Sequence, residues 1–146
     1  MIWYILKRLK AKSWNDLYVL ALSVLEVPDY LKQILNIAKI KSTHEPIGIM
    51  ILPLKDLYLG HPITRPRLSH DCRKRLNVLE GYKHKHHMSK DLLRAILPSS
   101  TDIEVVEVGG KYMVLNGNGR VYCLKQKLCE SATASVVLYK ENKKNE

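Results

Sequence analysis

The sequence predicts an α/β (α+β) fold in which a small mixed sheet follows an N-terminal helical segment. Apolar residues recur at helical spacing before residue 45, short β-branched runs bounded by proline and glycine follow, and a glycine loop joins a strand to a helix. Because 146 residues suit one compact domain, we expect a helical segment at 1–45, a domain at 46–140 and a charged tail at 141–146.

The segment before residue 45 contains two helical patterns. Ser13 followed by Asp16 resembles a capping box, and it precedes an apolar run that extends to about Val27. Pro28 fits the first turn of the next helix, where its missing N–H costs nothing. The second pattern is an apolar stripe formed by Tyr30, Leu31, Ile34, Leu35 and Ala38.

The pattern changes from helix to strand and turn at Pro46. Ile47–Leu52 is short, apolar and β-branched, and Pro53 stops it. Pro62 and Pro66 argue against a regular helix over 61–67. The other elements expected here are a connector at Leu54–Leu57, a basic helix near His70–Leu79, a loop at Gly81–His87 and a helix from Ser89 to Leu97.

The last third of the chain has the clearest pattern. A β-branched hairpin is expected there, and its second strand leads through a GxGR loop into a helix. Gly109-Gly110 suits a two-residue hairpin turn, since glycine tolerates positive φ. The expected elements are a strand at Ile103–Val108, its partner at Lys111–Leu115, a helix from Arg120 to about Glu130 and a final strand at Ser135–Tyr139.

Positive charge is concentrated in the middle of the chain. The formal net charge is +10, and residues 46–100 hold ten Lys and Arg against four Asp and Glu. A basic surface suits phosphate, nucleic acid or an acidic partner, although a solvated basic face explains charge excess equally well.

The cysteines and the apolar runs indicate the compartment. Three cysteines without a CxxC pair predict free thiols and a reducing environment, so we expect a cytoplasmic protein. The longest apolar run, Leu17–Leu25, is too short for a bilayer that needs about 20 residues, so we expect no transmembrane segment.

The loop from Asn116 to Arg120 has the chemistry of an anion site. Its glycines permit close backbone approach, and the first N–H groups of the helix that follows have no intrahelical partner. Arg120 lies where the helix dipole is already positive, so a phosphate or a carboxylate such as Glu104 or Glu107 must offset its charge. The spacing is neither GxGxxG nor a Walker loop, and a structural turn with a salt-bridged arginine is the commoner explanation of such glycines.

The residues around this loop resemble the ParB/sulfiredoxin superfamily over roughly residues 47–140. Those domains carry a GKY–hydrophobic–GxxR stretch followed by A-L/A-K, and Gly117 and Arg120 match its two fixed positions. The flanking matches are Tyr112, Leu115, Leu124 and Lys125, the strand and I-P-x-x-x-L-like run at Ile49–Leu57, the family's Asn-Pro-Arg position at His61–Arg67, and the closing strand at Val136–Tyr139.

The resemblance implies that the chain binds a nucleotide (ATP, ADP or CTP) by its phosphates, with Mg²⁺ bridging them. An enzyme of this kind would transfer a phosphoryl group or hydrolyse the nucleotide, with Asp56 or Glu104 as the nearest candidate base; whether the chain is an enzyme is left open. The nucleotide-binding residues predicted in this way are Arg65, Arg67, Asn116, Gly117, Asn118, Gly119 and Arg120.

Departures from the family pattern argue against its known reactions. Asn118 stands where sulfiredoxins have their reactive cysteine, and Asn116 and Gly119 stand where ParB-like serine kinases have Asp and His. Partition-type ParB proteins use a Glu-Arg-Arg arrangement and a following helix-turn-helix domain, for which this sequence leaves too little length. Phosphate binding is the property that these departures leave intact.

The rival prediction is a non-enzymatic module that holds DNA or RNA. Arg73, Lys74 and Arg75 would contact the phosphate backbone, although a solvated basic surface explains the same cluster. No helix-turn-helix, zinc-finger or aromatic RNA-binding motif supports this function.

Two further segments have less specific patterns. The run from His84 to His87 offers two imidazoles on one face, but Lys85 opposes a cation and no Cys or acidic residue adjoins, so we expect an exposed basic loop and no metal site. Met1–Lys12 is basic and amphipathic; it suits a membrane surface, although packing on the neighbouring helices is the commoner role of such a segment.

Overall fold

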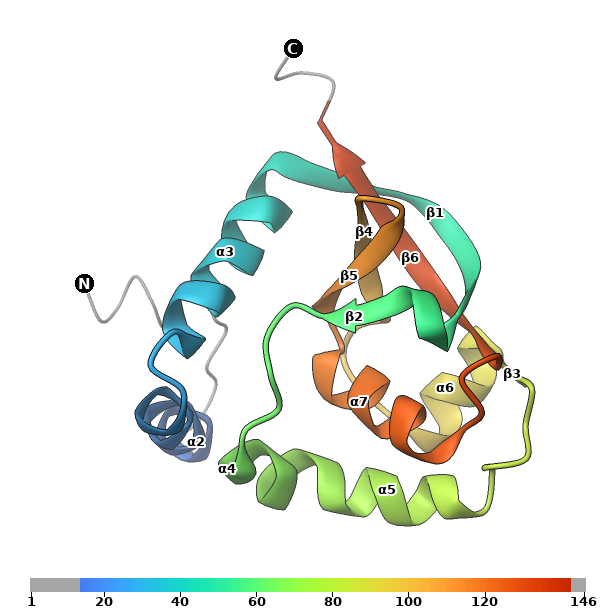
Figure 1. Ribbon diagram of the computed structural model, residues 1–146, viewed down its shortest axis with the longest axis horizontal. Helices are drawn as coiled ribbons and strands as arrows, with labels where there is room; N and C mark the ends of the chain where they lie inside the picture. The colour runs from blue at the N-terminus through green and yellow to red at the C-terminus, as the bar shows by residue number, and fades with distance from the viewer. Residues whose placement is uncertain (1–13, 143–146) are drawn as a thin grey trace.

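The structure is a computed structural model that describes residues 14–142 (Figure 1). The expected cap at Ser13, the segment Met1–Lys12 and the tail beyond residue 142 lie outside the described residues. The described chain begins with α2 (Trp14–Glu26) and α3 (Tyr30–Thr43), as the two helical patterns predicted.

A six-stranded mixed sheet forms the centre of the described fold, in the order β1-β6-β4-β5-β2, with β3 beside the start of β6. β6 is antiparallel to β1 and parallel to β4, the β4–β5 pair is an antiparallel hairpin, and β2 is parallel to β5. The strands are β1 (His44–Pro53), β2 (Leu57–Leu59), β3 (His87–Met88), β4 (Glu104–Val108), β5 (Lys111–Asn116) and β6 (Thr133–Glu141). The predicted fold class is therefore confirmed.

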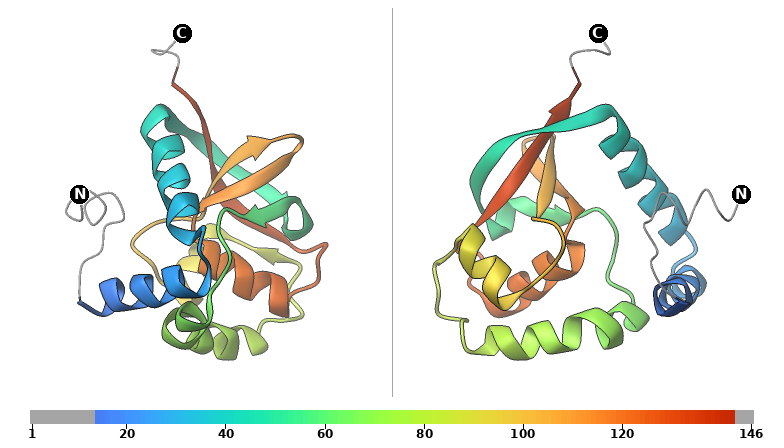
Figure 2. Two further views of the ribbon diagram at one scale, coloured as in Figure 1. Left: turned by 60° about the vertical axis from the view of Figure 1, so that its left-hand side comes forward. Right: turned by 180° about the vertical axis from the view of Figure 1, so that it is seen from behind.

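Helices lie on both faces of this sheet (Figure 2). Val105 and Val114 face the main core with α5, α6 and α7, whereas the alternate positions Val106 and Leu115 face Ile37 of α3. Three consecutive helical segments form one continuous rod: α4 (Arg65–Arg67), the π-helical turn η2 (Leu68–Cys72) and α5 (Arg73–Glu80). The other helices of the main core are α6 (Lys90–Ile96) and α7 (Asn118–Lys127). A short 3-10 turn, η1 (Leu54–Asp56), leads into β2.

Several boundaries differ from the prediction for identifiable reasons. Arg65–Arg67 is helical although 61–67 was expected to be irregular, because Pro66 lies in the first turn, where no N–H is needed. Leu57–Leu59 forms a strand whose pairing with β5 the local sequence does not reveal. α7 begins at Asn118, two residues earlier than predicted, and ends at Lys127, so Cys129 lies beyond it.

Gly60, directly after β2, has no room for a side chain. A Cβ there would lie 2.6 Å from the Val114 carbonyl oxygen and 2.7 Å from Ile37 Cδ1. We expect Gly60→Ala to lower the free energy of unfolding by about 1–3 kcal/mol, measured by urea denaturation followed by circular dichroism. The control is Gly81→Ala, where the nearest atom is 3.7 Å away; its cost should stay below about 1 kcal/mol. Equal losses in the two variants would contradict this packing.

Candidate functional site

The glycine loop connects β5 to α7 through a left-handed residue. Gly117 is the N-cap of α7 and has φ 92°. A Cβ at this position would lie 2.9 Å from Arg120 Nη2 and 3.1 Å from Ile103 Cγ1. Glycine is therefore required here both by the backbone conformation and by the guanidinium that packs against it.

The first turn of α7 offers unpaired backbone donors. The N-cap provides no side-chain hydrogen bond, and the first intrahelical bond runs from the Val121 N–H to the Gly117 carbonyl at 2.9 Å. The N–H groups of Asn118, Gly119 and Arg120 consequently have no intrahelical acceptor. Together with the helix dipole they make this end of α7 a positive site.

The Arg120 side chain is directed into the fold. It is 4% exposed, and its Nη1 donates to the Thr101 carbonyl oxygen at 2.8 Å. Burial, with a smaller contribution from the charge of Arg75, lowers the pKa of Arg120 to about 10, while Asp102 and Glu104 act in the opposite direction. Arg120 thus ties α7 to the segment before β4, and its contact with a phosphate stays a prediction.

Asn118 is also occupied by contacts within the fold. Its side chain is 4% exposed, accepts from the Gly60 N–H at 2.8 Å and donates to the Val114 carbonyl at 3.3 Å. Asn118 can therefore offer a ligand only its backbone N–H. Asn116, at the end of β5, is half-buried and lies opposite Glu104 in the β4–β5 ladder.

Arg75 lies beside the glycine loop. Its Nη1 is 3.0 Å from the position that a Cβ on Gly119 would take, and its charge contributes to lowering the pKa of Arg120. Among the side chains that the structure describes, no carboxylate pairs with it. Arg73 and Lys74 are exposed, so the structure separates Arg75 from the basic cluster in which the sequence placed it.

The sequence contains a signal that could have assigned Arg75 to this site. Cys72 and Leu79 are buried and Leu76 is half-buried, and with Arg75 they form a set at helical spacing on the inner face of the rod. The side chain of Arg75 also approaches Cys72. A hydrogen bond with Cys123, together with the nearby charge of Arg75, lowers the pKa of the Cys72 thiol against the opposing effect of burial.

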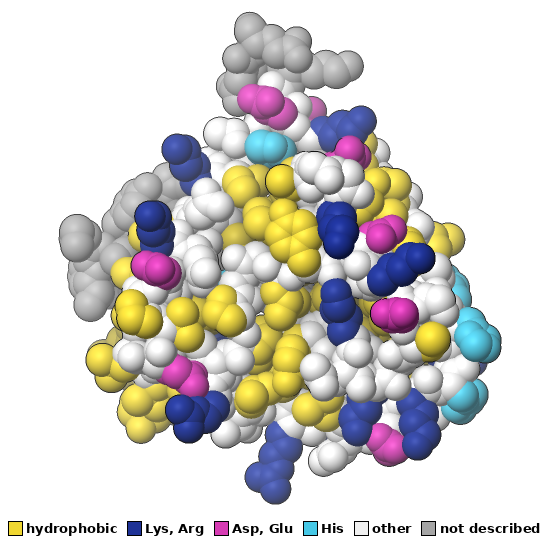
Figure 3. Space-filling view, in the orientation of Figure 1, with side chains coloured by type: hydrophobic (Ala, Val, Ile, Leu, Met, Phe, Trp, Pro, Cys, Tyr) yellow, Lys and Arg dark blue, Asp and Glu magenta, His cyan; other side chains and the backbone are white. Residues whose placement is uncertain are grey.

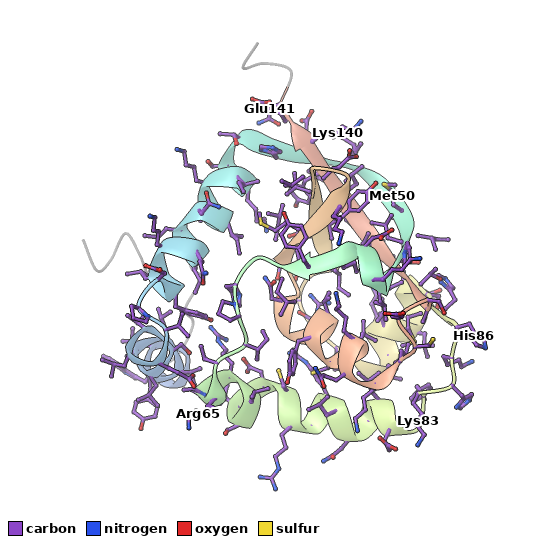
Figure 4. All side chains as sticks on the ribbon, in the orientation of Figure 1. Met50, Arg65, Lys83, His86, Lys140 and Glu141 are labelled. Carbon is purple, nitrogen blue, oxygen red and sulfur yellow. The ribbon has the colours of Figure 1, made fainter. Side chains whose placement is uncertain are left out.

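Arg65 and Arg67 form ion pairs with carboxylates outside the Asn116–Arg120 loop. Arg65 is 88% exposed, and its Nε donates to Glu26 of α2 at 2.8 Å; Figure 4 shows it projecting outward at the start of the rod. Arg67 donates from Nη1 to Asp71 at 2.9 Å, one helical turn further along. Their hydrogen bonds tie both arginines to α2 and the rod, and a role toward a nucleotide stays a prediction.

A second polar cluster lies beside Arg67. The Tyr30 ring is fully buried and meets the His61 ring edge-on, with 5.1 Å between the ring centroids. Burial lowers the pKa of His61, and the charge of Arg67 contributes in the same direction. The His61 ring therefore packs between the start of α3 and the loop after β2 in surroundings that disfavour its protonated form.

The two candidate bases differ in their surroundings. Glu104 accepts from Lys41 Nζ at 2.7 Å and from the Tyr139 hydroxyl. Burial acts to raise the pKa of Glu104, but these hydrogen bonds outweigh it and hold the pKa below its ordinary value. Asp56 is half-buried in η1. Neither carboxylate has a hydrogen bond or ion pair in the structure with residues 117–120.

The histidine run is exposed, but its last residue, His87, begins β3 rather than ending the loop expected at Gly81–His87, because it pairs with Thr133 of β6. His84, His86 and His87 are exposed, and His86 is labelled at the edge of the molecule in Figure 4. His87 Nδ1 lies 2.7 Å from Thr133 Oγ1. Within the described residues, no group of three or more His, Cys, Asp or Glu side chains is arranged to hold a metal ion.

The contact between Gly117 and Arg120 predicts a coupled stability effect. We expect Gly117→Ala to lower the free energy of unfolding by about 2–4 kcal/mol, because it adds a Cβ–guanidinium clash to the cost of a left-handed alanine. The control, Gly109→Ala, has φ 60° and no atom within 4 Å of the new Cβ, so it should cost only about 1 kcal/mol.

A double-mutant cycle separates the two parts of this cost. In an Arg120→Met background, Gly117→Ala should cost clearly less than in the parent chain, because the clashing guanidinium is gone. An unchanged cost in urea denaturation would show that Arg120 does not pack on Gly117.

Comparison of the chain with protein-family models, with curated proteins and with solved structures finds no match. The likeness to the ParB/sulfiredoxin superfamily therefore stays a prediction from the quoted residues. The geometry of the α7 N-terminus supplies the independent physical argument.

Proposed function

We propose that the chain binds a nucleotide through its phosphates at the N-terminus of α7. The observation that carries this proposal is the position of Arg75, whose guanidinium lies over Gly119 with no carboxylate partner among the described side chains. Two guanidinium groups and a helix N-terminus are thus close together, and a bound anion would relieve their repulsion.

The residues of this site would have different roles. The N–H groups of Gly119 and Arg120 would donate to phosphate oxygens, and Arg75 would add a charge-assisted hydrogen bond. The Arg120 side chain, held by Thr101, would act by positioning the first turn of α7 and by its charge.

Binding is better supported than catalysis. Mg²⁺ prefers oxygen ligands, but the two carboxylates whose charge acts on Arg120 are engaged, Asp102 by Arg94 and Glu104 by Lys41. The residues present therefore do not form a metal site of their own, and Mg²⁺ would arrive on the phosphates of the nucleotide. No described side chain is placed as a general base toward the loop, so we propose no reaction.

The proposal predicts a specific loss of affinity in one arginine variant. Titration calorimetry with ATP, ADP and CTP, each with Mg²⁺, should detect binding of at least one nucleotide. Arg75→Ala should weaken that binding about tenfold or more, since a charged hydrogen bond contributes about 1.5–3 kcal/mol. The matched control is Arg73→Ala, which removes the same charge from the exposed face of the same helix and should leave the affinity nearly unchanged. Absence of binding to all three nucleotides, or equal losses in both variants, would overturn the proposal.

Nucleic-acid binding is the second candidate function. The observation in its favour is the exposed face of the rod, where Arg73 and Lys74 stand side by side without an ion pair among the described side chains. Arg75 is turned inward and Arg65 is paired with Glu26, so the surface offers fewer free cations than the sequence suggested.

Salt dependence distinguishes this function from nucleotide binding. Two phosphate contacts release about two counterions, so the affinity for a short duplex should fall with a logarithmic slope near 2. We expect only weak duplex binding, removed by Arg73→Ala/Lys74→Ala and retained in Arg75→Ala, as measured by fluorescence anisotropy at two salt concentrations. Tight duplex binding without any nucleotide binding would favour the nucleic-acid function.

A further inference from the structure

Helix α2 has an inner face that is packed and an outer face that is not. Val19 and Leu20 are buried, and Ser23 is fully buried with its Oγ 2.6 Å from Thr64 Oγ1. The opposite side is exposed: Trp14 is 84%, Tyr18 65% and Leu25 80% accessible.

The exposed residues form one stripe along the helix. Trp14, Tyr18, Ala21 and Leu25, here called the α2 stripe, are spaced by four, three and four residues and are all exposed. Such spacing places them on one line of the helix surface. Figure 3 shows hydrophobic side chains gathered over α2 at the lower left of the molecule.

This stripe differs from the outer face of an ordinary surface helix, which carries charged and polar residues. Contiguous exposed apolar surface usually marks an interaction site. No helix within residues 14–142 is long and apolar enough to cross a membrane. The stripe runs along the length of α2, so a partner would contact the side of the helix.

The sequence next to the stripe indicates the partner. Residues 1–12 contain Lys7, Arg8, Lys10 and Lys12 and no acidic residue. Both tryptophans of the chain, Trp3 and Trp14, fall in this region. Tryptophan and tyrosine favour the boundary between lipid headgroups and acyl chains, and clustered lysine and arginine favour anionic lipid.

We propose that the α2 stripe docks on the surface of an anionic lipid bilayer, to which the positive charge of residues 1–12 would be attracted. Pairing of two copies through this stripe gains no electrostatic attraction, because both copies carry the same basic sequence, whereas an anionic surface attracts it. At the other end of the stripe, Arg65 pairs with Glu26 at 2.8 Å, so the Glu26 carboxylate adds no uncompensated negative charge there.

The two tryptophans provide a direct test with the full chain. Trp3→Tyr leaves Trp14 as the only tryptophan, so its fluorescence reports on the α2 stripe. Vesicles of phosphatidylcholine with ~30% phosphatidylserine should shift the emission to shorter wavelength and carry the protein upward in flotation. Pure phosphatidylcholine vesicles, or high salt, should reduce this binding about tenfold or more.

A matched pair of variants tests the location. Tyr18→Ser/Leu25→Ser should weaken vesicle binding about tenfold or more. Ile49→Ser/Ile51→Ser, which alters two residues of β1 that are 56% and 61% exposed, should leave it unchanged. Both pairs change surface residues, so circular dichroism should show the parent fold.

Three outcomes would overturn the proposal. The first is no binding to anionic vesicles at low salt, and the second is equal loss in the two pairs of variants. The third is a Trp14 emission that lies at shorter wavelength even without vesicles. The stripe would then be covered by another part of the chain, or by a second copy if sedimentation shows a dimer. None of these outcomes depends on whether a nucleotide binds.

Discussion

The left-handed turn at Gly117 is the constraint on which the candidate site depends. Because this residue has no side chain, the Arg120 guanidinium can fold back over it and reach the Thr101 carbonyl. The same turn places Asn118 where it accepts from the Gly60 N–H. The first turn of α7 therefore joins the loop after β2 to the segment before β4, and the backbone donors at its start are held in a fixed position.

The positive charges around this turn are compensated unequally. Arg120 is buried, which is costly for a cation, but it has a carbonyl acceptor and lies near Asp102 and Glu104. A pKa of about 10 still leaves it charged at neutral pH. Arg75 has no such compensation among the described side chains, although it lies at the positive end of α7. An anion is the simplest group that would balance this arrangement, and it is the physical basis of the proposed function.

Local patterns in the sequence predicted most of the fold. The hairpin around Gly109-Gly110, the strand–loop–helix unit and the two N-terminal helices follow from turn chemistry and periodicity. β2 was missed because a three-residue strand is defined by its partner β5 rather than by its own residues. Arg75 was grouped with Arg73 and Lys74 because they are adjacent in sequence, whereas the helix turns about 100° per residue and points adjacent side chains in different directions. The burial of Arg120 depends on tertiary contacts that no local pattern contains.

The two surfaces to which we assign roles are linked through one segment of the chain. Ser23, on the packed side of α2, is bonded to Thr64, and Gly60, four residues before Thr64, is bonded to Asn118 in the first turn of α7. The outer stripe of α2 points away from these contacts, because it lies on the opposite side of the helix from Ser23. A bilayer on that stripe would therefore not need to displace any contact that holds the glycine loop. If both proposals hold, the loop after β2 would connect the lipid-facing helix to the N-terminus of α7 through the packed side of α2, and the two ligands would occupy separate surfaces.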